Sequence, residues 1–265
     1  MLGAIIGDIV GSRFEFDGRA ERGFKLFTGA CDYTDDTICT VAIADAMLSQ
    51  MPYREKLLEW CRRYPEPKGG YGNMFREWVM SANAVPQGSC GNGAAMRVSS
   101  VGWLLDSYRD ILREAKRSAE VSHCHKEGIK GAQCVATLIY WLRTCRIGKD
   151  EVEAAVRRNF GYEIPSLRDI NRIGEEGHFD ATCQETVPWA IRCFLDAESY
   201  EDTVRLAVMA RGDTDTKAAI AGSIAEAYYV LPEDLVEQAF SYLPDDMLDV
   251  IERFYSTIQK EVYNS

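Results

Sequence analysis

The sequence predicts an all-α protein, and three observations lead to that prediction. Apolar residues recur at helical spacing in one segment after another, and Gly- or Pro-containing turns separate these segments. No stretch shows the sustained apolar–polar alternation of a half-buried strand, and no repeat with a period of about 20–50 residues is visible. A chain of 265 residues is long enough to bury a core. We therefore expect one compact helical domain spanning residues 1–265.

The composition is that of an ordinary soluble protein. Hydrophobic residues make up 46% and charged residues 27%, and the formal net charge is -11. This acidic excess disfavours nucleic acid and anionic membranes as partners, except where a local basic patch intervenes. No uninterrupted apolar run is long enough to cross a membrane, and residues 1–10 lack the basic start of a signal peptide. The nine cysteines include no C-x-x-C pair, and several, such as Cys134 and Cys145, lie in apolar helical patterns. They predict reduced core thiols in a cytoplasmic protein.

The first predicted helix, at residues 1–10, has glycines four positions apart, at Gly3, Gly7 and Gly11. This spacing places small residues on one face and lets another helix approach closely. Glu15 follows in a short loop, and the segment 17–31 is rich in glycine and charge, so we expect a flexible loop there.

The remaining elements follow in order. A loop is expected at 65–72, and the polar segment 161–179 is expected to cover a surface or extend one rim. Further helices are predicted at 38–47, 53–63, 74–80, from Gly93 to about Asp106, 109–121, after His125 through Leu142, 151–159, 186–197, 200–210, 218–225, 235–243 and 247–262.

Two short segments, far apart in the chain, combine carboxylates and hydroxyls where an apolar helix is predicted to start. They are Thr-Asp-Asp at 34–36 and Asp-Thr-Asp-Thr at 213–216. Plain helix capping is one interpretation of each segment, although a cap needs only one such acceptor. The alternative is a cation site, because adjacent like charges repel unless a positive charge lies between them. Oxygen ligands suit Mg²⁺ or Mn²⁺ rather than Zn²⁺.

A glycine-rich turn, Ser-Cys-Gly-Asn-Gly at 89–93, precedes another predicted helix. Such a turn presents backbone N–H groups to an anion, although a plain loop-to-helix junction is the alternative. The turn is not a Walker A loop, because no G-K-[ST] ends it. His123 and His125 follow the helix at 109–121, where either ligand binding or a capping or solvent-facing position is open.

Four blocks of the chain, taken in order, resemble those of the ADP-ribosylglycohydrolases. These are Gly-Asp-x-x-Gly at 7–11 followed by Glu15, Thr-Asp-Asp at 34–36, Gly-Asn-Gly-Ala-Ala-Met-Arg at 91–97, and Gly-Asp-Thr-Asp-Thr at 212–216. That family includes the nitrogenase-reductase-activating glycohydrolase and the ADP-ribosylarginine and ADP-ribosylserine hydrolases. The blocks are spread over most of the chain, and the resemblance agrees with an all-α fold.

The resemblance implies a site for two Mg²⁺ or Mn²⁺ ions beside a pocket for ADP-ribose. The metal ligands it implies are Thr34, Asp35, Asp36, Asp213, Asp215 and Thr216. The glycine-rich turn would lie against the diphosphate, and the substrate-binding residues are Ser89, Gly91, Asn92, Gly93 and His123. The candidate catalytic residues are Glu15, whose loop is mobile in the family, and the aspartates Asp35, Asp36 and Asp215. The sequence does not decide which of these carboxylates is the general base.

The expected function is hydrolysis of the glycosidic bond between ADP-ribose and a modified acceptor, with release of ADP-ribose. The acceptor is an arginine or serine side chain of a protein, or another ADP-ribosyl conjugate. We expect a monomer with no membrane partner, and nucleic acid only as a modified substrate. Two alternatives stay open: a catalytically inactive ADP-ribose-binding or structural relative, and hydrolysis of another ribosyl or phosphoryl substrate by the same metals.

Three residues depart from the family pattern. Cys90 stands where relatives often carry an aromatic residue, Arg211 where they usually have glycine, and Lys217 where a small residue is common. Arg211 and Lys217 either reach the acidic site or face solvent. Solvent exposure is expected for Lys217, which lies one step along a new helix.

Overall fold

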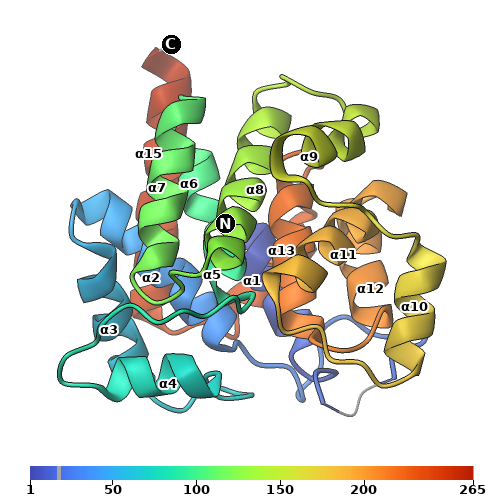
Figure 1. Ribbon diagram of the computed structural model, residues 1–265, viewed down its shortest axis with the longest axis horizontal. Coiled ribbons are helices and arrows are strands. Elements are labelled where there is room, and N and C mark those ends of the chain that lie inside the picture. Colours follow the sequence, from blue (N-terminus) through green and yellow to red (C-terminus); the bar gives the residue numbers. More distant parts are fainter. Residues whose placement is uncertain (17–18, 265) are drawn as a thin grey trace.

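The computed structural model describes the backbone of residues 1–16 and 19–264 and the side chains through residue 259, and helices dominate this described part (Figure 1). The α-helices are α1 (Leu2–Gly11), α2 (Asp35–Ser49), α3 (Tyr53–Arg63), α4 (Asn73–Met80), α5 (Gly93–Met96), α6 (Ser99–Leu104), α7 (Tyr108–Glu120), α8 (Lys126–Arg143), α9 (Val152–Phe160), α10 (Leu167–Glu175), α11 (Cys183–Asp196), α12 (Tyr200–Met209), α13 (Thr214–Glu226), α14 (Glu233–Phe240) and α15 (Asp245–Asn264). A 3₁₀ turn, η1 (Lys149–Glu151), precedes α9. Within the described ranges, β-type pairing is limited to isolated bridges such as that between Thr34 and Lys68. The all-α prediction is confirmed.

Two helical segments differ from the prediction. The single helix predicted from Gly93 to about Asp106 is two short helices, α5 and α6. It breaks because Arg97 and Val98 have ψ angles of -3° and -2°, far from the helical value near -42°. The segment 161–179 contains α10, which the sequence pattern did not predict because only Ile170 and Gly174 of this helix are buried.

All nine cysteines lie in the described part of the chain and are free, as predicted, but Cys124 and Cys145 are exposed and are not core thiols. Cys145, however, does not belong to a buried helical face. It follows the end of α8, is exposed, and has a φ of 52°. Of the loop expected to be flexible at 17–31, residues 17–18 lie outside the described residues.

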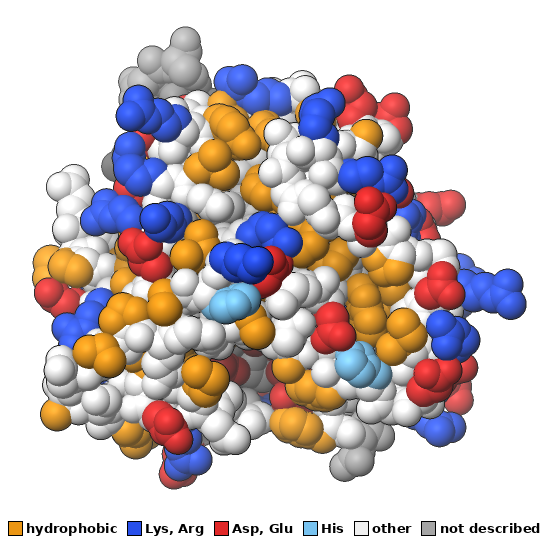
Figure 2. Space-filling model, viewed as in Figure 1, with side chains coloured by type: hydrophobic (Ala, Val, Ile, Leu, Met, Phe, Trp, Pro, Cys, Tyr) orange, Lys and Arg blue, Asp and Glu red, His pale blue; other side chains and the backbone are white. Residues whose placement is uncertain are grey.

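The surface carries both signs of charge. On the face shown in Figure 2, basic and acidic side chains are interspersed, with apolar side chains between them. A search of the described helices for one that is long and apolar enough to span a membrane finds none.

The centre of the molecule is the pair α1 and α13, which cross in close contact (Figure 1). A Cβ atom at Gly7 would lie 2.1 Å from the carbonyl oxygen of Ala218, and one at Gly11 would lie 2.5 Å from the Cα of Asp215. These distances confirm that the glycine spacing of the first helix serves a close helix approach. The start of α13 is therefore placed directly against the end of α1.

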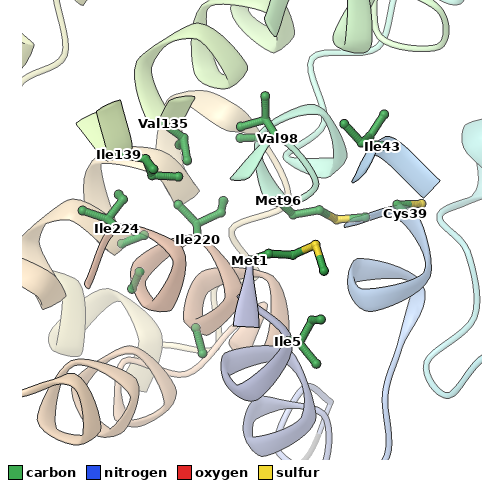
Figure 3. Close-up of a cluster of buried hydrophobic side chains, with 14 of the residues drawn as sticks. Met1, Ile5, Cys39, Ile43, Met96, Val98, Val135, Ile139, Ile220 and Ile224 are labelled. Carbon is green, nitrogen blue, oxygen red and sulfur yellow. The ribbon is translucent and has the colours of Figure 1, made fainter. Parts of the chain in front are cut away.

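The core surrounds this pair. Every residue of α13 is buried, so the helix has no solvent-facing side. Ile5 of α1, Ile220 and Ile224 of α13, and Val135 and Ile139 of α8 belong to one buried cluster (Figure 3). Met96 and Cys39 extend the same cluster toward α5 and α2. Because this packing fixes α1, α2, α5 and α13 against one another, it also fixes the segments at their ends.

Candidate functional site

The start of α2 is held by Asp8 of α1. Thr34 is the N-cap of α2, and its hydroxyl oxygen accepts from the backbone N–H of Asp36 at 3.2 Å. The Thr34 hydroxyl donates to Oδ1 of Asp8 at 2.7 Å, and the backbone N–H groups of Thr34 and Thr37 each donate to Oδ2 at 3.0 Å. Asp8 is fully buried and satisfied by these bonds. In the sequence, Asp8 stands out only as part of the Gly-Asp-x-x-Gly motif, and nothing near it indicates this positioning role.

The start of α13 is built differently. Arg211 and Gly212 have φ angles of 57° and 72°, and Asp213 follows as the N-cap. The Asp213 side chain makes no capping bond to its own helix. Instead its Oδ2 accepts from the side-chain amide of Asn92 at 2.7 Å. Helix capping therefore does not explain why a carboxylate stands at this position.

The two acidic segments face each other across the α2–α13 junction. The hydroxyl of Thr216 donates to Oδ2 of Asp36 at 3.0 Å. Carboxylate oxygens of Asp8, Asp36 and Asp215 lie within 4.8 Å of one another, and so do those of Glu15, Asp213 and Asp215. The other oxygen of Asp36, Oδ1, is buried and has no hydrogen-bond partner among the described residues. The donor set is entirely oxygen, which suits a hard divalent cation.

Burial and mutual repulsion act together on these carboxylates. Burial raises the pKa values of Asp35, Asp36 and Asp215 well above their usual range, and Coulomb repulsion from neighbouring carboxylates adds to the shift. Carboxylates so placed ionise together only when a positive charge lies close to them. The cluster therefore favours a bound cation at neutral pH.

Glu15 lies at the outer edge of the cluster and is half-buried. Burial, followed by repulsion from Asp213, raises the pKa of Glu15 to about 7. Its Oε2 has no hydrogen-bond partner in the described structure. A carboxyl group with a pKa near neutrality is suited to exchange protons at physiological pH.

The acidic cluster forms one wall of a cavity of about 320 Å³. This wall is lined by Glu15, Asp35, Asp213, Asp215 and Thr216. Thr34 and Asp36 are buried behind it. The residues of the predicted substrate-binding set also line the cavity: Ser89, Gly91, Asn92, Gly93 and His123. The same cavity has apolar surface from Phe75, Met96 and Phe179 and cationic surface from Arg97. All four sequence blocks thus converge on one cavity.

The glycine-rich turn offers fewer free donors than its sequence indicates. The N–H of Gly91 donates to the Ser89 hydroxyl at 3.1 Å, and the N–H of Asn92 donates to the carbonyl of Ala181 at 3.1 Å. The Asn92 side-chain amide is also committed, to Asp213 and to the carbonyl of Asp180 at 3.2 Å. Asn92 therefore braces the acidic wall as well as lining the cavity.

His123 is oriented by a buried hydrogen-bond relay. Nη2 of Arg97 donates to the Ser122 hydroxyl at 2.8 Å, and that hydroxyl lies 2.9 Å from Nδ1 of His123. Ser122 accepts from Arg97, and its own proton is free to point to Nδ1, an arrangement that would leave the imidazole proton on Nε2. Burial, with Coulomb repulsion from Arg97, lowers the pKa of His123 well below its usual value. A neutral ring thus lies against the glycine-rich turn, where a Cβ at Gly93 would lie 3.1 Å from Nε2.

Lys217 contradicts the expectation of solvent exposure. Its side chain is fully buried, and its ammonium donates to Oδ1 of Asp180 at 2.8 Å. The expectation was wrong because every side of α13 is enclosed, so no position in its first turn can reach solvent. Asp180 was missed altogether, since it lies in a polar loop with no pattern around it. The only sequence signal of a buried anionic partner was the position of Lys217, directly before a run of small and apolar residues at 218–225.

Comparisons with known proteins show which family this chain resembles over its length. A family model described as ADP-ribosylglycohydrolase matches residues 1–263. The ADP-ribosylhydrolase ARH3 of Bos taurus is 26% identical, with coverage of 94% of this chain and 89% of that protein. The ADP-ribosylarginine hydrolase Tri1 of Pseudomonas putida is 25% identical, covering 90% of this chain and 72% of that protein.

A solved structure described as an ADP-ribosylglycohydrolase-related protein complex shares the fold. Its TM-score is 0.71 at 22% identity, with coverage of 97% of this chain and 95% of that chain. At this level of identity the likeness bears on the fold alone.

Proposed function

This chain belongs to the ADP-ribosylglycohydrolase family, and we propose that the cavity between α2, α5 and α13 is where it hydrolyses the bond between ADP-ribose and an acceptor. The observation that carries the proposal is the convergence of two acidic helix starts and the glycine-rich turn on one cavity. An acidic wall at one end and a polar turn at the other match a substrate with a ribose at one end and a diphosphate beside it.

Two Mg²⁺ or Mn²⁺ ions would be held by Thr34, Asp35, Asp36, Asp213, Asp215 and Thr216. The fit rests on the all-oxygen donor set and on the unpartnered, buried Oδ1 of Asp36. Asp8 is better assigned to positioning, because its oxygens already accept bonds from Thr34 and Thr37. Bound divalent ions would supply polarisation of a water and of neighbouring oxygens.

The protein's own residues supply the remaining steps. Ser89, Gly93 and the N–H at Nε2 of His123 would bind the diphosphate, and Phe75 would shield one side of the cavity from water. Glu15 is our first candidate for general base, with Asp35, Asp36 and Asp215 as alternatives. The transition state would have oxocarbenium character, as in other glycosidic cleavages.

The acceptor is a protein side chain, such as arginine or serine, or a small ADP-ribosyl conjugate. The similarity to the ADP-ribosylarginine hydrolase of Pseudomonas putida supports arginine as one candidate acceptor. The free cysteines support a cytoplasmic location, and the continuous core supports one domain across residues 1–265. A monomeric state is also part of the proposal, and size-exclusion chromatography with light scattering would test it.

The direct experiment incubates the purified protein with a panel of ADP-ribosylated substrates. Arginine-linked, serine-linked, nucleic-acid-linked and small conjugates are supplied with Mg²⁺, with Mn²⁺ or with a chelator, and released ADP-ribose is measured. We expect release from at least one linkage and loss of release with chelator. Binding of ADP-ribose without release from any linkage would favour the inactive binding module.

A further inference from the structure

The side chains of Asp180 and Lys217 form a buried ion pair next to the acidic wall, outside the motifs that identify the family. Both side chains are fully buried, and their closest atoms are 2.8 Å apart. The Lys217 ammonium also donates to the carbonyl of Arg211 and lies 5.3 Å from the ring centroid of Trp189. Lys217 thus has an anion, a carbonyl and an aromatic face around it.

Asp180 is bonded to Asp213 by two routes. Its Oδ1 accepts from the backbone N–H of Asp213 at 3.1 Å. Its backbone carbonyl accepts from the amide of Asn92 at 3.2 Å, and the same amide donates to Oδ2 of Asp213 at 2.7 Å. Backbone and side chain of Asp213 are therefore both fixed with reference to Asp180.

The turn that these contacts hold is strained. Arg211 and Gly212 are consecutive residues with positive φ, 57° and 72°, and positive φ is uncommon for a side chain such as arginine. A Cβ at Gly212 would lie 2.3 Å from Oδ1 of Asp180, so the turn packs directly on that carboxylate. A turn of this kind persists only when surrounding groups hold it.

We propose that Asp180 is a positioning residue that holds the 211–213 turn and aims the carboxylate of Asp213 into the cavity, while Lys217 balances its buried charge. The inference rests on the proposed function, because it concerns the metal-binding wall of that same site. A buried ion pair is a poor source of stability, since apolar replacements of similar volume are often neutral or stabilising. Holding Asp213 in place explains why a carboxylate is buried at position 180, which a gain in stability from the ion pair does not explain.

Two double variants separate positioning from stability. In Asp180→Asn with Lys217→Met, the charges are removed but the asparagine oxygen still accepts from Asp213. In Asp180→Leu with Lys217→Met, the charges and the acceptor are both removed. Mn²⁺ affinity is measured on the full chain by the loss of the free Mn²⁺ electron paramagnetic resonance signal, and thermal unfolding is followed in chelator.

We expect the asparagine double variant to bind Mn²⁺ within about threefold of wild type. The leucine double variant should bind about 10–100-fold more weakly, the usual effect of removing an outer partner of a metal ligand. Equal Mn²⁺ affinities for the two double variants would overturn the inference. A wild-type chain that binds no Mn²⁺ would instead refute the proposed metal site itself, and the inference with it.

A second pair of variants covers the case in which the leucine variant does not fold. Gly212→Ala places a methyl group against Asp180, whereas Gly177→Ala introduces the same kind of strain at a φ of 85° with nothing within 4 Å. Gly177→Ala reports the cost of the backbone strain alone, so Gly212→Ala should lose more stability, and only Gly212→Ala should weaken Mn²⁺ binding, by at least about tenfold. Wild-type Mn²⁺ affinity in Gly212→Ala would also overturn the inference.

Discussion

Gly11→Ala should damage the metal site from outside it, by pushing α13 away from α1. The added Cβ would lie 2.5 Å from the Cα of Asp215 and 2.7 Å from its backbone nitrogen. Ordinary contacts of this kind are at least about 3.4 Å, so one backbone must move by roughly 1 Å. Over-packing costs about 1–3 kcal/mol, and the helix preference for alanine over glycine offsets at most about 1 kcal/mol of that.

The net loss in the free energy of unfolding should therefore be about 1–2 kcal/mol. The larger effect should be on Mn²⁺ affinity, with a loss of at least about tenfold, because Asp215 itself is displaced. Denaturant unfolding in chelator gives the first quantity, and calorimetric titration with Mn²⁺ gives the second.

Gly3→Ala is the matched control. Its Cβ would lie 2.3 Å from the carbonyl oxygen of Gly222, a similar clash on the same pair of helices. Gly222 lies two helical turns beyond the acidic start of α13, so Gly3→Ala should lose comparable stability and keep wild-type Mn²⁺ affinity. Unchanged Mn²⁺ affinity in Gly11→Ala, or equal loss in both variants, would refute this reasoning.

Four further predictions concern the site directly. Asp35→Ala or Asp215→Ala should abolish Mn²⁺ binding measured by calorimetry, because each removes a charged oxygen ligand; unchanged affinity in both variants would contradict the ligand assignment. Glu15→Gln should lower single-turnover release of ADP-ribose by about 10²–10⁴-fold while a binding titration shows retained ADP-ribose affinity; wild-type turnover would remove Glu15 from the mechanism. Gly91→Val should weaken ADP-ribose binding and spare Mn²⁺ binding, since a Cβ there already lies 3.5 Å from Nε2 of His123; equal loss of both would indicate a folding defect. Burial raises the pKa values of Asp8 and Glu15 to about 6 and about 7, above their unfolded values, so their contribution to stability is present below about pH 4 and lost as the pH rises through about 6–7. The metal-free protein should therefore melt lower at about pH 8 than at about pH 5, and saturating Mn²⁺ should raise the melting temperature more at the higher pH; scanning fluorimetry with chelator or Mn²⁺ measures both, and equal melting temperatures at the two pH values in chelator would contradict the prediction.

Local patterns predicted most of the helices and the oxygen-rich residue types of the site. The spacing of Gly3, Gly7 and Gly11 predicted a close helix approach, and Thr34 was predicted at a helix start. These predictions succeeded because helix periodicity, capping and glycine spacing depend on neighbours within a few residues. The short helix α10 was missed because only Ile170 and Gly174 of it are buried, in a segment that is otherwise polar.

Only the tertiary structure decided which distant groups share the acidic wall. Asp8 is tied to Thr34 across 26 positions, and Asp180 to Lys217 across 37. Neither separation leaves a local signal, because the partners are brought together by the packing of α13 among its neighbours. The same packing buried Lys217, although its place in the sequence favoured solvent: a residue on a fully enclosed helix has no polar side to face, so its charge must find a partner inside.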